Sequence, residues 1–190
     1  MATDLQKENR KFIKKYSKPV IYGTFGTTLF PSVKMAQACL ESNYGRATIK
    51  NAKNLFGIKA AGEHTPYWNG AAVNASTKEE YNGVVKPQKS DFRKYKSFTD
   101  SVKDHTYFLK QYARYKPVFE AKTPEDQARA LQKAGYATDS GYASKLINII
   151  NTYDLKKLDK KKEIMKAVRI IVASLIIMAV GYYIYEVVKY

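Results

Sequence analysis

The sequence is poor in the residues on which several kinds of site depend. Among 190 residues there are one cysteine and two histidines. The single cysteine, Cys39, excludes an intramolecular disulfide framework and a cysteine-rich zinc site. His64 and His105 lie far apart in the sequence, and we expect neither to bind a metal ion.

Negative charge is also scarce. Seventeen acidic residues face 33 lysines and arginines, which gives a formal net charge of +16. Such an excess indicates an anionic partner: nucleic acid, an anionic membrane surface, or an anionic polymer such as cell wall. Lysine greatly outnumbers arginine, whereas proteins that read nucleic acid depend on arginine for bidentate contacts. We therefore expect no nucleic-acid partner.

The length and the remaining composition fit a folded domain with an appendage. The chain is 45% hydrophobic and 26% charged, which is ordinary for a globular protein. Residues 1–10 lack the apolar core of a secretory signal peptide, so none is expected. Phe12, Ile13 and Tyr16 follow at helical spacing among lysines, which predicts an amphipathic helix packed on the domain.

The C-terminal segment is the longest uncharged stretch. Ile170 to Tyr185 contains no formal charge, and residues 167–188 would form a helix about 33 Å long, enough to cross the hydrocarbon core of a membrane. Several tyrosines near its end are typical of a membrane interface. The alternative is a buried core helix, but no face of the stretch is polar. We predict a folded domain at 1–155, a basic linker at 156–166, and a transmembrane helix with its tail at 167–190.

The distribution of lysines predicts the orientation of this anchor. Seven of the eight basic residues after position 155 precede the uncharged stretch that begins at Ile170, and only Lys189 follows it. The positive-inside rule would then keep the N-terminal domain in the cytoplasm. The expected location is a membrane, with a single C-terminal pass through the host cytoplasmic membrane or a virion membrane.

The globular part alternates between helical and irregular segments. Residues 31–40 have helical spacing, with Pro31 suited to a first turn and Ser32 or Thr28 as a possible cap. Residues 57–94 are punctuated by glycine and proline, and Asn82-Gly83 predicts a tight β-hairpin. Helices are expected again at 101–112, 123–134 and 142–153. The predicted fold class is α+β, mainly helical with a small β lobe.

Two carboxylates are candidates for chemistry. Val33, Gln37 and Glu41 form one ridge of the helix predicted from Pro31, so Glu41 ends a face that is otherwise apolar. A carboxyl group against apolar surface has a raised pKa, which suits a general acid. Alternation along the hairpin puts Glu79 and Glu80 on opposite faces. A pair of carboxylates is what glycosidases use, although either side chain alone is more often a solvated surface residue.

Aromatic residues also favour a carbohydrate ligand, because their flat faces suit sugar rings. Many of them will belong to the core. The residues concerned are Tyr44, Phe56, Tyr67, Trp68, Tyr81, Tyr107, Tyr112, Tyr115, Tyr136 and Tyr142.

Five sequence blocks follow one another in a recognisable order. They are F-P-S-V-K-M-A-Q-A-C-L-E-S-N-Y-G at 30–45, N-L-F-G-I-K at 54–59, T-K-E-E-Y-N-G at 77–83, F-R-K-Y at 92–95 and A-G-Y-A-T-D at 134–139. Together they resemble the glucosaminidase domains that cut bacterial peptidoglycan, glycoside hydrolase family 73. The resemblance spans about residues 12–155, and the blocks are specific together rather than singly. The family usually ends the first block E-S-G-W-G, so Asn43 and Tyr44 depart from its pattern.

The resemblance implies a lysozyme-like fold that hydrolyses the β-1,4 bond after N-acetylglucosamine without a metal or organic cofactor. Glu41 would be the general acid and Glu79 the second carboxylate, with Glu80 as the alternative. Inversion, retention and participation of the substrate's acetamido group all stay open. The implied substrate-binding residues are Tyr44, Asn54, Phe56, Tyr115, Tyr136 and Asp139.

We therefore predict a membrane-anchored endo-β-N-acetylglucosaminidase whose partners are peptidoglycan strands and, through residues 167–188, a lipid membrane. Peptidoglycan lies outside the cytoplasmic membrane, whereas the lysines predict an inside domain. A phage lysis enzyme or a virion-associated entry enzyme would reconcile the two. The alternatives are a lytic transglycosylase, which also uses one helical glutamate, and a non-catalytic wall-binding or structural membrane protein.

Overall fold

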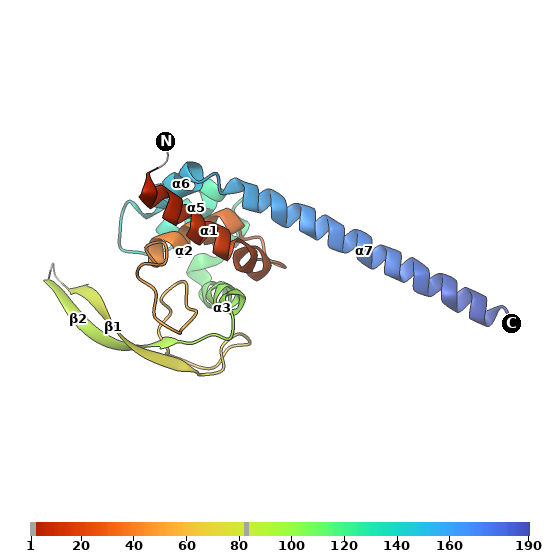
Figure 1. Ribbon diagram of the computed structural model, residues 1–190, viewed down its shortest axis with the longest axis horizontal. Helices are drawn as coiled ribbons and strands as arrows, with labels where there is room; N and C mark the ends of the chain where they lie inside the picture. The colour runs from red at the N-terminus through yellow and green to blue at the C-terminus, as the bar shows by residue number, and fades with distance from the viewer. Residues whose placement is uncertain (1–2, 82–83) are drawn as a thin grey trace.

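The computed structural model describes residues 3–81 and 84–190, and for 77–81 and 84–87 only the course of the backbone. A compact group of helices carries a two-stranded ribbon on one side and one long helix that leaves it on another (Figure 1). The elements are α1 (Asp4–Gly23), α2 (Pro31–Glu41), β1 (Ala72–Tyr81), β2 (Val84–Arg93), α3 (Phe98–Gln111), a 3-10 turn η1 (Ala113–Tyr115), α4 (Lys116–Glu120), α5 (Pro124–Lys133), α6 (Tyr142–Thr152) and α7 (Lys156–Val188).

Helix α2 lies at the centre of the helical body. Residues 31–39 are all buried, and α2 contacts α1, α5, α6 and α7. The predicted amphipathic helix at the N-terminus is confirmed, since Phe12, Ile13 and Tyr16 of α1 are buried in the same core. A helix enclosed on every side holds its last residue, Glu41, in a fixed place.

The start of α2 differs from the expectation that Ser32 or Thr28 caps it. The N-cap residue is Phe30, whose side chain has no hydrogen-bonding group. The cap comes from a distant part of the chain, because the Ser32 backbone N–H donates to Asp159 Oδ1 of α7 at 2.8 Å. A carboxylate at this end of the helix also complements the helix dipole.

The predicted β lobe is a single antiparallel hairpin. Strands β1 and β2 pair with Ala72 opposite Arg93 and Tyr81 opposite Val84. The predicted Asn82-Gly83 turn lies outside the described residues. The ribbon projects away from the helices, and its base meets the loop before it through a bridge between Lys59 and Phe92.

Helix α7 is continuous from the basic segment into the apolar one. Residues 156–166, expected as a linker, are helical, and Leu158 and Lys162 are buried against the domain. Lys162 Nζ donates to the carbonyl oxygens of Thr27 at 2.9 Å and Leu29 at 2.8 Å. From Ile170 onward the helix is exposed, and by length and hydropathy it could cross a membrane. The bounds of the three-part division stay a prediction.

Candidate active site

A cleft of about 730 Å³ opens between the helical body and the loop that precedes the hairpin. One side is formed by α3 and η1, and the other by residues 56–65. Glu41 and Tyr136 lie in the same lining. The lining combines aromatic and polar side chains, which suits a sugar ligand. The aromatic side chains of the lining are Phe56, Tyr107, Phe108, Tyr112, Tyr115 and Tyr136.

Glu41 reaches the cleft from the last position of α2 and is held by Tyr142. The Tyr142 hydroxyl donates to Glu41 Oε1 at 2.9 Å and accepts from Gln37 Nε2 at 3.2 Å. Gln37 and Glu41 therefore meet one tyrosine, as expected for neighbours on one ridge of a helix. This arrangement fixes the direction of the carboxyl group.

The environment of Glu41 raises its pKa. Glu41 is exposed at the cleft, but the protein packed around its carboxyl group displaces part of the water that would stabilise the charged form. The hydrogen bond from Tyr142 acts on the pKa in the opposite direction and is the weaker effect. The C-terminal end of a helix carries partial negative charge, which also opposes ionisation. Glu41 thus has the features of a general acid: access to the cleft, a fixed orientation, and a proton held to higher pH than by a solvated glutamate.

A second polar chain runs beneath the cleft. Lys34 Nζ lies 2.6 Å from His105 Nδ1, and His105 Nε2 lies 2.8 Å from the Tyr136 hydroxyl. The Phe56 ring stacks on the imidazole at 4.1 Å. Burial lowers the pKa of both Lys34 and His105, and the lysine charge lowers that of the histidine further. This hydrogen-bonded series ends at Tyr136, which also feels the charge of Glu41. The pKa of Tyr136 is raised by burial and then by the Glu41 charge.

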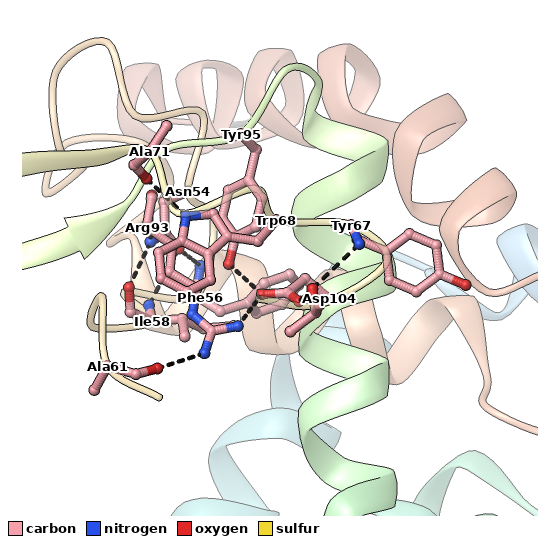
Figure 2. A network of polar contacts seen from close by, with 11 residues as sticks. Asn54, Phe56, Ile58, Ala61, Tyr67, Trp68, Ala71, Arg93, Tyr95 and Asp104 are labelled. Atoms are coloured by element: carbon pink, nitrogen blue, oxygen red, sulfur yellow. Dashed lines mark hydrogen bonds and ion pairs between the residues drawn. The ribbon is translucent and has the colours of Figure 1, made fainter. Parts of the chain in front are cut away.

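The outer wall of the cleft is held by a buried ion pair (Figure 2). Arg93 of β2 donates to Asp104 Oδ2 of α3 at 2.8 Å, and Tyr95 donates to the same oxygen at 2.7 Å. The Trp68 indole covers the Arg93 guanidinium at 4.2 Å. These contacts fix the base of the hairpin against α3, and the Arg93 side chain lines the cleft.

Comparison with known proteins identifies the family. Residues 26–155 match the glucosaminidase family, described as mannosyl-glycoprotein endo-beta-N-acetylglucosaminidase. The chain belongs to the glucosaminidase family. The exo-glucosaminidase LytG of Bacillus subtilis (strain 168) is 37% identical over 146 residues, which is 74% of this chain and 50% of LytG. The peptidoglycan hydrolase FlgJ of Escherichia coli (strain K12) is 36% identical over 148 residues, 75% of this chain and 46% of FlgJ.

Solved structures agree with this assignment. The catalytic domain of the autolysin Auto from Listeria monocytogenes has a TM-score of 0.69 and 33% identity, over 84% of this chain and 91% of that one. The glycoside hydrolase domain of Salmonella typhimurium FlgJ has a TM-score of 0.64 and 32% identity, over 85% and 97%. The expected mainly helical, lysozyme-like fold is thereby confirmed. The chain spans about half the length of the curated relatives it matches.

The structure brings four of the predicted site residues of this glucosaminidase domain together. Glu41, Phe56, Tyr115 and Tyr136 all line the cleft. Glu79 lies in β1, with its Cα opposite that of Lys86. Its side chain, like that of Glu80, lies outside the described residues, so its role as second carboxylate stays a prediction.

The other three predicted site residues do not line the cleft. Tyr44 packs with its ring 6.3 Å from Phe12 and 5.6 Å from Tyr153, so it belongs to the core behind α2 rather than to a cleft floor. Asn54 is buried and holds the next turn, because its Nδ2 donates to the Ile58 carbonyl oxygen at 2.9 Å. Asp139 accepts from the Gly141 N–H at 2.8 Å, at the start of α6, and pairs with Lys145.

Other residues of the cleft were not predicted as site residues from the sequence. The sequence raises His105 only as a possible metal ligand. Its place in a hydrogen-bonded series has no sequence signal, because its partners Lys34 and Tyr136 come from other parts of the fold. Lys34 lies one turn from Gln37 on α2. Its sequence signal is a charged residue within a helix whose other residues are suited to burial. Glu63 lies on the loop before the hairpin, and Arg114 lies on η1. In such segments the spacing of residues does not show in which direction a side chain points.

Proposed function

We propose that this chain hydrolyses the β-1,4 bond that follows N-acetylglucosamine in bacterial peptidoglycan, with Glu41 as the general acid. The observation that carries the proposal is the Glu41 carboxyl group, held by Tyr142 in an aromatic cleft with a raised pKa. The names of its relatives, peptidoglycan hydrolase and exo-glucosaminidase, support the substrate class.

In this mechanism protonated Glu41 donates its hydrogen to the glycosidic oxygen as the bond to the sugar breaks. A second carboxylate then activates water or stabilises the positive charge that develops on the sugar ring. Glu79 is our candidate, with Glu80 as the alternative. Glu63 also lines the cleft and gives a third position to test. Comparing Glu79→Gln, Glu80→Gln and Glu63→Gln assigns the role: the variant that loses activity by 100-fold or more, at roughly the level of Glu41→Gln, carries it.

The identity of the cleaved bond is tested by mass spectrometry of digested peptidoglycan. Hydrolysis after N-acetylglucosamine predicts products that end in reducing N-acetylglucosamine. Anhydro-muramyl ends would instead identify a lytic transglycosylase, and the absence of products from both wild type and Glu41→Gln would favour a wall-binding protein. The length of the first products separates an endo-acting enzyme, which releases long fragments, from an exo-acting one.

We also propose that α7 anchors the domain to a membrane. The basic side chains Lys166 and Arg169 immediately precede the exposed apolar part, and the Arg169 guanidinium lies 5.3 Å from the Phe25 ring at the end of the domain. Lysine, arginine and aromatic side chains at this level are typical of the lipid headgroup region. The docked first turns of α7 would then hold the domain close to the membrane surface rather than on a free tether.

Flotation of the full chain with lipid vesicles tests the anchor. We expect wild type to float and to resist extraction at alkaline pH. Replacing Ile171, Leu175 and Met178 with aspartate should abolish flotation, because a charge in the middle of a span costs about 3 kcal/mol each. The matched control places three aspartates at the exposed positions Lys157, Lys160 and Lys161, outside the apolar part. The anchor would be refuted if wild type sedimented while the vesicles floated, or if alkaline pH removed the protein from the vesicles.

The orientation of the anchor bears on the setting of the reaction. All seven basic residues of α7 precede the uncharged stretch that begins at Ile170, so the positive-inside rule would put the domain on the cytoplasmic side, away from peptidoglycan. A role in phage lysis or in entry from a virion membrane reconciles these facts and is part of our proposal. A coding region surrounded by ordinary flagellar or division genes would count against it.

A further inference from the structure

Lys34 and His105 are buried side by side beneath the cleft, and the reaction proposed above gives neither of them a role. Each is about 1% exposed. Within the part of the chain that the structure describes, Lys34 forms no ion pair, and its polar partner is His105 Nδ1. A buried lysine without a carboxylate destabilises a fold, so a pair of this kind at an active site calls for a functional reason.

The two hydrogen bonds restrict where the hydrogens lie. If Lys34 donates to Nδ1, a neutral imidazole carries its hydrogen on Nε2 and donates it to the Tyr136 hydroxyl oxygen. The hydroxyl hydrogen of Tyr136 is then free to point into the cleft. In the opposite arrangement Nδ1 donates to a neutral Lys34, and Tyr136 has to donate its hydrogen to Nε2, away from any ligand.

Three points favour the first arrangement. A lysine amine carries hydrogens that it can donate whether it is charged or neutral, whereas it can accept a hydrogen bond only when it is neutral. The Phe56 ring lies 5.4 Å from Lys34 Nζ, where its face stabilises a positive charge. The same ring stacks on His105 at an interplanar angle of 14°, which prevents the imidazole from turning over. The titratable groups that act on the Tyr136 hydroxyl are Glu41, Tyr115 and Tyr142.

We propose that Lys34 and His105 are positioning residues that keep the Tyr136 hydroxyl as a hydrogen-bond donor into the cleft. Its acceptor would be an oxygen of the glycan bound beside Glu41, a sugar hydroxyl or an acetamido carbonyl. The inference rests on the proposed function, because it assumes that the cleft holds a glycan. Lys34 acts only through His105, and His105 only through Tyr136.

The tautomer of His105 is measured directly by nitrogen NMR on the full chain labelled in histidine and held in detergent micelles. A His64→Gln variant assigns the signals, since the sequence has two histidines. We expect a neutral ring with its hydrogen on Nε2. A ring protonated on Nδ1, or on both nitrogens, would overturn the proposal. This measurement needs no enzymatic activity, so it is decided separately from the proposed hydrolysis.

Kinetics on peptidoglycan fragments test the consequence with a matched pair. Glutamine at position 105 can accept from Lys34 through its oxygen and donate to Tyr136 through its nitrogen, whereas phenylalanine can do neither. We expect His105→Phe and Lys34→Met to lower kcat roughly tenfold, and His105→Gln to retain most of it. In a Tyr136→Phe background, Lys34→Met should have little further effect.

The contrary results are equally defined. Equal losses in His105→Gln and His105→Phe, or a loss from Lys34→Met that persists in the Tyr136→Phe background, would mean that the pair acts only through packing. Thermal unfolding of each variant identifies those that fail to fold, and the NMR measurement on wild type decides the proposal even then. Inactivity of the wild type would refute the proposed function while leaving the tautomer result in place.

Discussion

At the scale of single residues, the proposed chemistry depends on keeping a proton on Glu41. Burial raises the pKa of this carboxyl group, and the hydrogen bond donated by Tyr142 partly offsets the rise, because it stabilises the charged form. The general acid is active while protonated, so activity falls as pH rises through this raised pKa.

Tyr142→Phe should therefore extend activity to higher pH. Without the hydroxyl the carboxylate loses a donor worth about 1.5 kcal/mol, and the alkaline limb of the pH profile of kcat/KM should move up by as much as about one pH unit. The measurement is kcat/KM against pH on soluble glycan fragments.

Tyr153→Phe supplies the matched control for this change. Tyr153 follows α6 directly, and its hydroxyl accepts from Asn9 Nδ2 at 2.7 Å rather than contacting Glu41. The pH profile of the Tyr153→Phe variant should have the same alkaline limb as that of wild type. A limb that stays in place or moves to lower pH in Tyr142→Phe would contradict the assignment of Glu41 as the titrating acid.

At the scale of elements, the cleft depends on how the hairpin is joined to α3. The Arg93 and Asp104 side chains are 10% and 0% exposed, and Asp104 also accepts from Tyr95 and Thr65. The strands form a ribbon of only two members, which is marginally stable without such an attachment.

Arg93→Met should destabilise the protein by about 3 to 5 kcal/mol, because it leaves the Asp104 carboxylate buried without its cation. Urea unfolding measures the loss. Arg129→Met removes an arginine from an exposed pair with Asp126 and should cost less than about 1 kcal/mol. Equal costs in the two variants would mean that the Arg93 pair is not an attachment point.

The first turns of α7 belong energetically to the domain. Leu158 is buried, Asp159 caps α2, and Lys162 binds two carbonyl oxygens of the segment before α2. A chain that ends at residue 168 should therefore be more stable to urea than one that ends at residue 155, by about 3 kcal/mol or more. Leu158→Ala within the longer chain should account for much of this difference. Equal stability of the two chains would show that residues 156–168 are a true linker.

The sequence predicted the elements better than their contacts. Helical spacing located α2 and α6 within a residue or two, and the ridge of Gln37 and Glu41 anticipated one face of the site. Tyr44 and Asn54 were assigned to the cleft because motifs record which residues recur, not the direction in which each side chain points. The cap on α2 joins residues 127 positions apart, and the two hydrogen bonds from Lys34 through His105 to Tyr136 join residues 71 and 31 positions apart. A local sequence pattern contains no information on such distant pairs.

At the scale of the whole molecule, the charge of +16 divides between two parts. Eight basic and three acidic residues lie in 156–190, which leaves +11 on the rest of the chain. An excess of this size on a glycan-binding domain suits an anionic wall, since opposite charges draw the two surfaces together.

Binding to intact wall should then weaken with salt. We expect the association of the Glu41→Gln variant with insoluble peptidoglycan sacculi to fall several-fold between about 0.05 M and about 0.5 M sodium chloride, because screening shortens the range of the attraction. The variant is used so that the wall is not digested during the measurement. Retention that is insensitive to salt would assign binding to the cleft alone.

The central claim, that this glucosaminidase domain cleaves peptidoglycan through Glu41, is tested most directly by a zymogram of wild type beside Glu41→Gln. Glutamine keeps the size of the side chain and an oxygen that can accept from Tyr142, but it has no proton to donate to a glycosidic oxygen. We predict a cleared band for wild type and none for the variant at equal amounts of folded protein. Equal clearing by both would contradict the account.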